Sequence, residues 1–318
     1  MVLYYCKYNG ISLVLQQIKL DTMRLSIRII DAVRDTFDTM LFFAAMAVKE
    51  DFRNHVARAG TAADMNPSRR LAVLGNGPSL RDELSRLIAR REWERTDMMA
   101  VNFFALGDEF TVVRPQYYVL SDPQFFRRAG RSERVENLYR ALGERVNWPM
   151  TLYVQYYNPE RFDYRAAVGA NPNIRIVPFH TLVFRGLRSV EFWCYRHGLG
   201  SGNFGTVVQN GEFIGLLLGY RQIDLYGVDH TLLDGLTVDD RNRLCRTQSH
   251  YYDSAPTVPE PIFVNATDPP RPYTMHTYLA ETAELFRGHE VLRDYARSIG
   301  ARIINRTRGS MIDAYERE

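Results

Sequence analysis

The chain has 318 residues, 46% of them hydrophobic, and a formal net charge of +3 at pH 7. This length is enough for one large α/β domain with additions or for two modest domains. The charge is far below that of a dedicated DNA-binding protein, so we expect no nucleic-acid partner. The three cysteines are widely spaced and form no CxxC pair, which indicates a reducing compartment. We therefore expect a cytoplasmic protein.

Residues 1–60 are predicted to form a helical extension. Apolar residues recur at helical spacing from Ile11 to about Ala59, with basic and acidic residues between them. One interpretation is an appendage that packs on the main domain or on a second copy in a homo-oligomer. The other is an amphipathic helix that lies on the inner face of a membrane. The opening MVLYYCKYNG lacks the features of a signal peptide, and we expect no membrane span.

Residues 61–318 are predicted to form a single α/β domain, preceded by the linker-like GTAADMNPS (60–68). Amphipathic segments such as 80–92, 131–145 and 204–219 separate most of its short β-rich segments. The β-rich segments are 71–74, 98–103, 117–121, 151–155, 174–179, 222–228 and 301–305. This alternation predicts a Rossmann-like, mostly parallel sheet with helices on both faces.

The segment 253–273 carries six of the fourteen prolines and is predicted to contain no regular element. Long loops of this kind in compact domains are commonly lids or binding loops. We therefore expect a lid at about residues 230–275.

Small polar residues follow three successive strands of the predicted sheet. GNGPS (75–79) follows the first, Asn102 the second, and Ser121 and Asp122 the third. Ligands of parallel sheets bind beyond the carboxyl ends of the strands, where a glycine turn lets the backbone approach a phosphate. These residues therefore predict a nucleotide site. The alternatives are a plain βα turn at GNGPS and a turn residue at Asp122, which precedes a proline.

Four motifs carry a resemblance to a known family: GNGPSL, the VN of MAVNFF, SDPQFF, and LGYRQIDLYGVDH. They resemble the bacterial sialyltransferases that use CMP-sialic acid. The same skeleton, with IINRTRGSMIDAYER near the end, resembles hydroxymethylpterin diphosphokinase-like proteins of surface-polysaccharide gene clusters. The resemblance covers about 71–126 and 200–231, with a looser fit at 301–317.

The resemblance implies a glycosyltransferase with a Rossmann-like fold. It would move sialic acid, Kdo or a similar sugar from a CMP-linked donor to a hydroxyl of a glycan or lipid-linked glycan. No metal or further cofactor is implied. In place of the tyrosine that contacts the leaving phosphate in the family, this chain has the run Val228, Asp229, His230, Thr231. The donor sugar is therefore open.

Roles carried over from the family fall on several of the polar residues. Gly75, Asn76 and Gly77 would hold the donor phosphate and ribose, and Asn102 would contact the nucleotide or sugar. Asp122 stands where the family has an asparagine, and Ser201 or Thr206 matches the hydroxyl at the start of the donor-binding helix. The complete predicted binding set is Gly75, Asn76, Gly77, Ser79, Asn102, Ser121, Asp122, Ser201, Thr206 and Asp229.

Sugar transfer requires a general base for the acceptor hydroxyl, and histidine suits this role because its pKa lies near working pH. Three histidines are candidates. His230 follows a predicted strand and adjoins Asp229, which can orient its ring. His250, in QSHYYD, resembles the segment just before the catalytic histidine of the family. His276 matches that histidine if the proline-rich segment is an insertion.

No metal-binding motif is present in the sequence. Asp239 and Asp240 lack the Asp-x-Asp form of metal-dependent transferases, so we expect no required metal. Two other functions stay open. A pterin-type pyrophosphokinase would use ATP and Mg²⁺ and would need a carboxylate cluster. A non-catalytic nucleotide-binding protein would need neither.

Overall fold

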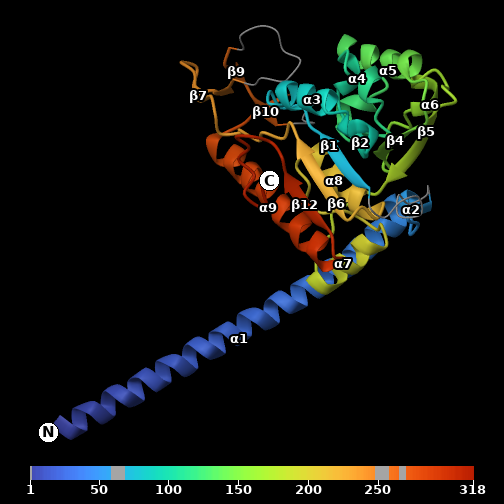
Figure 1. Ribbon diagram of the computed structural model, residues 1–318. Coiled ribbons are helices and arrows are strands. Elements are labelled where there is room, and N and C mark those ends of the chain that lie inside the picture. Colours follow the sequence, from blue (N-terminus) through green and yellow to red (C-terminus); the bar gives the residue numbers. More distant parts are fainter. Residues whose placement is uncertain (1, 59–68, 248–257, 265–269) are drawn as a thin grey trace.

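The computed structural model describes residues 2–58, 69–247, 258–264 and 270–318. In the first helix it describes the side chain of Lys19 and all side chains from residue 22 onward. Its centre is a seven-stranded, all-parallel sheet in the order β12-β6-β1-β2-β3-β4-β5 (Figure 1). The strands are β1 (Arg70–Leu74), β2 (Thr96–Val101), β3 (Tyr117–Leu120), β4 (Met150–Gln155), β5 (Ile174–Phe179), β6 (Gln222–Tyr226) and β12 (Arg302–Asn305). All seven predicted strands are confirmed, and with them the α/β class.

Helices cover both faces of this sheet. One face packs on α7 (Arg188–Arg196), α8 (Val207–Leu217) and α9 (Met275–Ser298). The other face packs on α3 (Leu80–Ala89), α4 (Phe110–Val113), α5 (Glu133–Arg145) and α6 (Tyr164–Ala167). Short 3-10 turns lie at η2 (Glu92–Glu94), η3 (Phe104–Leu106) and η4 (Pro123–Phe125).

Alternation along the strands decides which side chains meet which helices. In β1, Leu71 and Val73 join the core under α8 and α9, whereas Ala72 and Leu74 join the core under α3 and α5. All four are at most 1% exposed. Strands buried on both faces are continuously apolar, which is why their sequence segments were recognisable.

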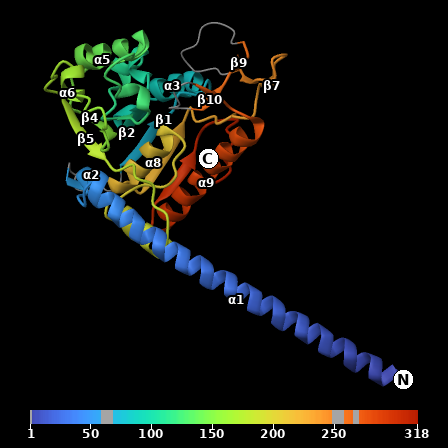
Figure 2. The same ribbon diagram turned by 180° about the vertical axis from the view of Figure 1, so that it is seen from behind.

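The N-terminal region is one 48-residue helix, α1 (Val2–Lys49), followed by the single turn α2 (His55–Arg58). Figures 1 and 2 show α1 projecting away from the rest of the chain. Its last turns pack against the sheet side, where Phe42 and Met46 are buried in the core. The predicted linker 60–68 lies outside the described residues, so the boundary between 1–60 and 61–318 stays a prediction. Among the described helices, none has the length and apolarity that crossing a membrane requires.

The predicted lid region contains short antiparallel strands. β7 (Leu236–Val238), β8 (Leu244–Arg246) and β9 (Glu260–Pro261) form one small sheet, and β10 (Phe263–Val264) pairs with β11 (Arg271–Pro272). The expectation that 253–273 contains no regular element is therefore wrong. Proline lacks only the N–H donor, and here it occupies the ends of two-residue strands, where one missing donor is tolerated.

The turns after β1 and β6 interlock at the point where the strand order reverses. The Gly75 N–H donates to the Tyr226 carbonyl and the Gly77 N–H to the Gly227 carbonyl, both at 2.8 Å. Gly227 has a φ of +65°, and a methyl group on it would lie 2.5 Å from the Leu80 Cβ. Its N–H donates to the buried Glu83 carboxylate at 2.7 Å. Glycine is required here for conformation and for close approach.

A matched pair of glycines tests this requirement. Gly130 has a similar φ of +68°, but an added methyl there would meet no atom within 4 Å. Gly130→Ala should lose about 1–2 kcal/mol through backbone strain, and Gly227→Ala about 1–3 kcal/mol more through overpacking. Urea unfolding midpoints measure both losses. Equal losses in the two variants would contradict the close packing of the turns.

Candidate functional site

A cavity of about 240 Å³ lies at the carboxyl ends of β3, β4 and β5, beside the start of α8. We call it the β3–α8 pocket. Its lining is Ser121, Asp122, Gln155, Thr181, Val183, Ser201, Gly202, Phe204, Gly205, Thr206, Val207 and Asn210. Four residues of the predicted binding set, Ser121, Asp122, Ser201 and Thr206, come together here from segments about eighty residues apart in sequence.

Asp122, which lines the pocket, forms a side-chain hydrogen bond with Asn102, which lies earlier in the sequence, at the end of β2. Burial raises the pKa of the Asp122 carboxyl, while hydrogen bonds from the side chains of Gln124 and Asn102 oppose that rise. Asn102 has a left-handed φ of +50°. The Tyr118 hydroxyl fixes this turn by donating to the Asn102 carbonyl at 2.6 Å and accepting from the Ala105 N–H at 2.9 Å. Strained backbone that neighbouring groups hold in this way is common at binding sites.

Asn102 also has an unused acceptor. Its Oδ1 is buried and has no hydrogen-bond partner among the described residues, and the same holds for Oδ1 of Asn76. These asparagines follow adjacent strands, β2 and β1. A buried polar atom without a partner costs free energy, so a ligand hydroxyl or amine that donates to it gains stability.

The start of α8 forms one wall of the pocket. Thr206 is the N-cap residue, and its hydroxyl accepts from the Val208 N–H at 3.0 Å. Ser201 is 3% exposed and donates to the Gly202 carbonyl. The N-terminus of an 11-residue helix attracts anions through its dipole and its main-chain N–H groups. Phe204 adds an aromatic surface. The pocket thus combines an acid, an anion-attracting helix end and an apolar wall.

Gly75, Gly77, Ser79 and Asp229 of the predicted binding set form a second group around the β1 and β6 turns. The Ser79 hydroxyl donates to Asp229 Oδ2 at 2.8 Å rather than capping α3. Burial raises the pKa of Asp229, against hydrogen bonds from Ser79. Because the N–H groups of Gly75 and Gly77 already serve carbonyl groups of the β6 turn, they are not available to a phosphate.

The three candidate bases lie in different places. His230 is a left-handed residue with its ring 5.0 Å from that of His289 on α9. Burial, and with it the nearby His289 and Arg246, lowers the pKa of His230 to about 3. A base this weak is poorly matched to neutral pH. His276 is exposed in the first turn of α9, and His250 lies outside the described residues. Neither His230 nor His276 lines the β3–α8 pocket.

Sequence reasoning missed Gln155 and Thr181, which line the pocket at the ends of β4 and β5. The strand-end argument that found Asp122 also applies to these two residues, because both strands were predicted. It missed His180 as well, which precedes Thr181 and is 3% exposed. No local signal marks His180, because its partner Glu50 is 130 residues away.

The low pKa of His230 predicts an acid-sensitive fold. Between its ordinary value of 6.5 and about 3, the unfolded chain binds a proton that the folded chain does not, so stability falls as pH falls. From pH 7 to pH 5 this amounts to about 2 kcal/mol. Asparagine tolerates the left-handed φ of residue 230. His230→Asn should therefore remove most of this pH-dependent loss of unfolding free energy in urea titrations, whereas the control His276→Asn should show the same loss as the natural chain. An unchanged pH dependence in His230→Asn would contradict the assignment.

No protein-family model matches the chain, and no curated protein matches it. Among solved structures, the chain is similar to the MAf glycosyltransferase from Magnetospirillum magneticum AMB-1, with 16% identity and a TM-score of 0.42. The similarity covers 78% of this chain and 33% of that one, so the chain spans about a third of the length of that protein.

Proposed function

We propose that the chain is a glycosyltransferase that moves a sugar from a CMP-linked donor to a hydroxyl of a bacterial surface glycan. The observation that carries this proposal is the β3–α8 pocket. Ser121, Asp122, Ser201 and Thr206 were selected from the sequence as nucleotide ligands, and they line this one cavity at the carboxyl edge of the sheet. The motif resemblance supplies the class of reaction.

The chemistry of the pocket supports a nucleotide handle. Asp122 in the lining is an acceptor, and the hydroxyls of ribose and the amine of cytosine are donors. The buried Oδ1 atoms of Asn102 and Asn76 lie outside the lining, after the adjacent strands β2 and β1. The start of α8 suits the donor phosphate. The cavity volume of about 240 Å³ is slightly below the roughly 300–1,000 Å³ of small-molecule pockets. It therefore suits the nucleotide, with the sugar and the acceptor extending beyond it.

The general base is proposed among His276 and His250 ahead of His230, because the low pKa of His230 leaves it a weak proton acceptor. The pocket ligands proposed here are hydroxyls, amides, a carboxyl and a helix end, so nucleotide binding should need no metal. Transfer assays with CMP-linked sugars and with glycan or lipid-linked acceptors test the proposed donor sugar and acceptor.

Nucleotide binding separates the candidate functions. In a thermal-shift and calorimetry panel of the full chain, CMP should stabilise the fold without added metal, because a ligand that binds only the folded state raises the melting temperature. If ATP with Mg²⁺ stabilises the fold and CMP does not, a pyrophosphokinase is favoured. No response to any nucleotide would remove the transferase proposal.

Two substitutions test the binding residues directly. Asp122→Asn and Asn102→Ala should each weaken CMP binding about 10-fold or more, because each removes a buried hydrogen-bond partner worth about 1–3 kcal/mol. Asp313→Asn, at an exposed position, is the matched control and should bind CMP as the natural chain does. Unaltered affinity in both pocket variants, with the fold intact by circular dichroism, would reject the β3–α8 pocket as the nucleotide site.

A further inference from the structure

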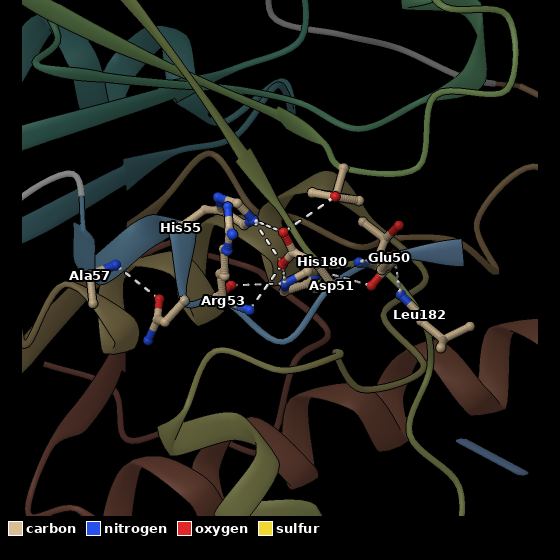
Figure 3. A network of polar contacts seen from close by, with 10 residues as sticks. Glu50, Asp51, Arg53, His55, Ala57, His180 and Leu182 are labelled. Atoms are coloured by element: carbon tan, nitrogen blue, oxygen red, sulfur yellow. Dashed lines mark hydrogen bonds and ion pairs between the residues drawn. The ribbon is translucent and has the colours of Figure 1, made fainter. Parts of the chain in front are cut away.

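Three metal-ligating side chains meet where α1 ends and where β5 ends (Figure 3). Asp51 follows α1, His55 begins α2, and His180 follows β5. One ligand atom from each lies within 4.8 Å of the others. We call this group the Asp51–His55–His180 cluster.

The spacing of the cluster is close to that of a coordinated ion. Asp51 Oδ1 lies 3.0 Å from His55 Nε2 and 3.5 Å from His180 Nε2. Two ligand atoms of a tetrahedral Zn²⁺, each at about 2.0–2.1 Å, are about 3.4 Å apart. Both observed distances therefore lie within a few tenths of an ångström of the value that coordination requires.

A carboxylate behind the cluster orients one of the rings. His180 Nδ1 lies 2.8 Å from Glu50 Oε2, and both side chains are 1% exposed. The other oxygen of Glu50 accepts from the N–H groups of Thr181 and Leu182, both at 3.2 Å. Figure 3 shows the His180 ring between Glu50 and Asp51. A carboxylate that fixes the far nitrogen is the usual support of a metal-ligating histidine.

The hydrogen-bond inventory of His180 also fits a cation. Its Nδ1 faces Glu50, and its Nε2 lies 3.0 Å from the Arg53 carbonyl and 3.5 Å from Asp51. Both nitrogens thus face acceptors, whereas a neutral imidazole carries only one proton. Either a second ring proton or a metal ion at Nε2 would supply the positive partner that these acceptors need.

We propose that the Asp51–His55–His180 cluster binds one Zn²⁺ through an Asp51 oxygen and the two Nε2 atoms. The partly exposed Asp51 and His55 leave the fourth position to water. A bound ion would tie the end of α1 and the α2 turn to the end of β5, next to Thr181 of the β3–α8 pocket. The site stands independently of the proposed glycosyltransferase activity.

Zinc titration of the chelator-treated full chain tests the site. One equivalent of Zn²⁺ should bind, and Co²⁺ in its place should give the visible absorption of a tetrahedral site. Asp51→Asn and His55→Ala, at partly exposed positions that tolerate change, should weaken binding more than about 100-fold, and Glu50→Gln about 10–100-fold. His197→Ala, at an exposed histidine, is the matched control and should bind one equivalent.

Zinc binding of natural strength by both Asp51→Asn and His55→Ala, with the fold intact by circular dichroism, would overturn the proposal. Absence of a bound equivalent in the natural chain would overturn it too.

A second, independent observation concerns the projecting part of α1. Apolar side chains recur every three or four residues there, and each is more than half exposed. They are Met23, Ile27, Ile30, Val33, Phe37, Met40 and Leu41. A stripe of this spacing is typical of a helix that packs on another helix.

The charged residues beside this apolar stripe favour a second copy of the helix over an anionic lipid surface as its partner. Within residues 22–40, three arginines balance three aspartates, so this part of the helix gains little from an anionic lipid surface. The signs are segregated along the helix. Residues 22–30 hold two arginines, and residues 31–40 hold one arginine and three aspartates. With Asp21 included, residues 20–30 carry +1. An antiparallel pair that crosses near Ile30 sets this segment against the −2 of residues 31–40, whereas a parallel pair sets like charges together.

We infer that a second copy of the chain packs antiparallel on this stripe. Sedimentation of the full chain should show a dimer, and Ile30→Asp or Phe37→Asp should give a monomer. Val112→Asp, at a partly exposed apolar position on α4, is the matched control and should leave the dimer intact. A monomeric natural chain that binds phosphatidylserine vesicles through Ile30 would overturn the inference.

Charge swaps test the orientation of the two helices. Arg24→Glu with Arg28→Glu should weaken the dimer, and adding Asp35→Lys with Asp38→Lys to the same chain should restore it. A failure of the second pair to restore the dimer would reject the antiparallel arrangement.

Discussion

The parallel direction of all seven strands is the constraint on which the rest of the structure depends. Because every carboxyl end meets the same edge, residues that follow different strands become neighbours there without any local contact in sequence. Ser121, Gln155 and Thr181 belong to three strands and line one cavity. The same edge carries His180 and the interlocked β1 and β6 turns. Binding groups at this edge are therefore products of topology rather than of any single segment.

Desolvation acts on the polar groups of this edge in two different ways. At Asp122, burial is opposed by hydrogen bonds from Asn102 and Gln124, so the acid is held in place and stays available to a ligand. At His230, Nε2 has no hydrogen-bond partner within the described part of the chain, and burial and nearby positive groups together lower the pKa of the ring. Two polar residues at strand ends thus differ in chemistry because their neighbours differ, which spacing in the sequence does not reveal.

The seven strands were predictable because strands buried on both faces contain short apolar runs, such as residues 71–74 in β1 and 98–101 in β2. The position of Ser121 and Asp122 at a strand end was predictable because strand ends are local features. Ser201 and Thr206 were chosen from the family resemblance alone, and a binding role for all four residues stays a prediction. The use of the Gly75 and Gly77 N–H groups by the β6 turn was not predictable, since the partners lie some 150 residues away. The short strands that end at Pro261 and Pro272 escaped prediction because two residues leave no alternating pattern in the sequence. The contact of Glu50 with His180 escaped it because the two residues are 130 positions apart.

The junction between α1 and the sheet connects the base of this long helix to the rim of the β3–α8 pocket. Its 48 residues span roughly 70 Å, and its base is anchored by Phe42 and Met46 in the core and by Glu50 on the backbone of Thr181. Thr181 is also a wall of the pocket. A shift of the helix base would therefore alter the contact between Glu50 and the Thr181 N–H at the rim of the cavity.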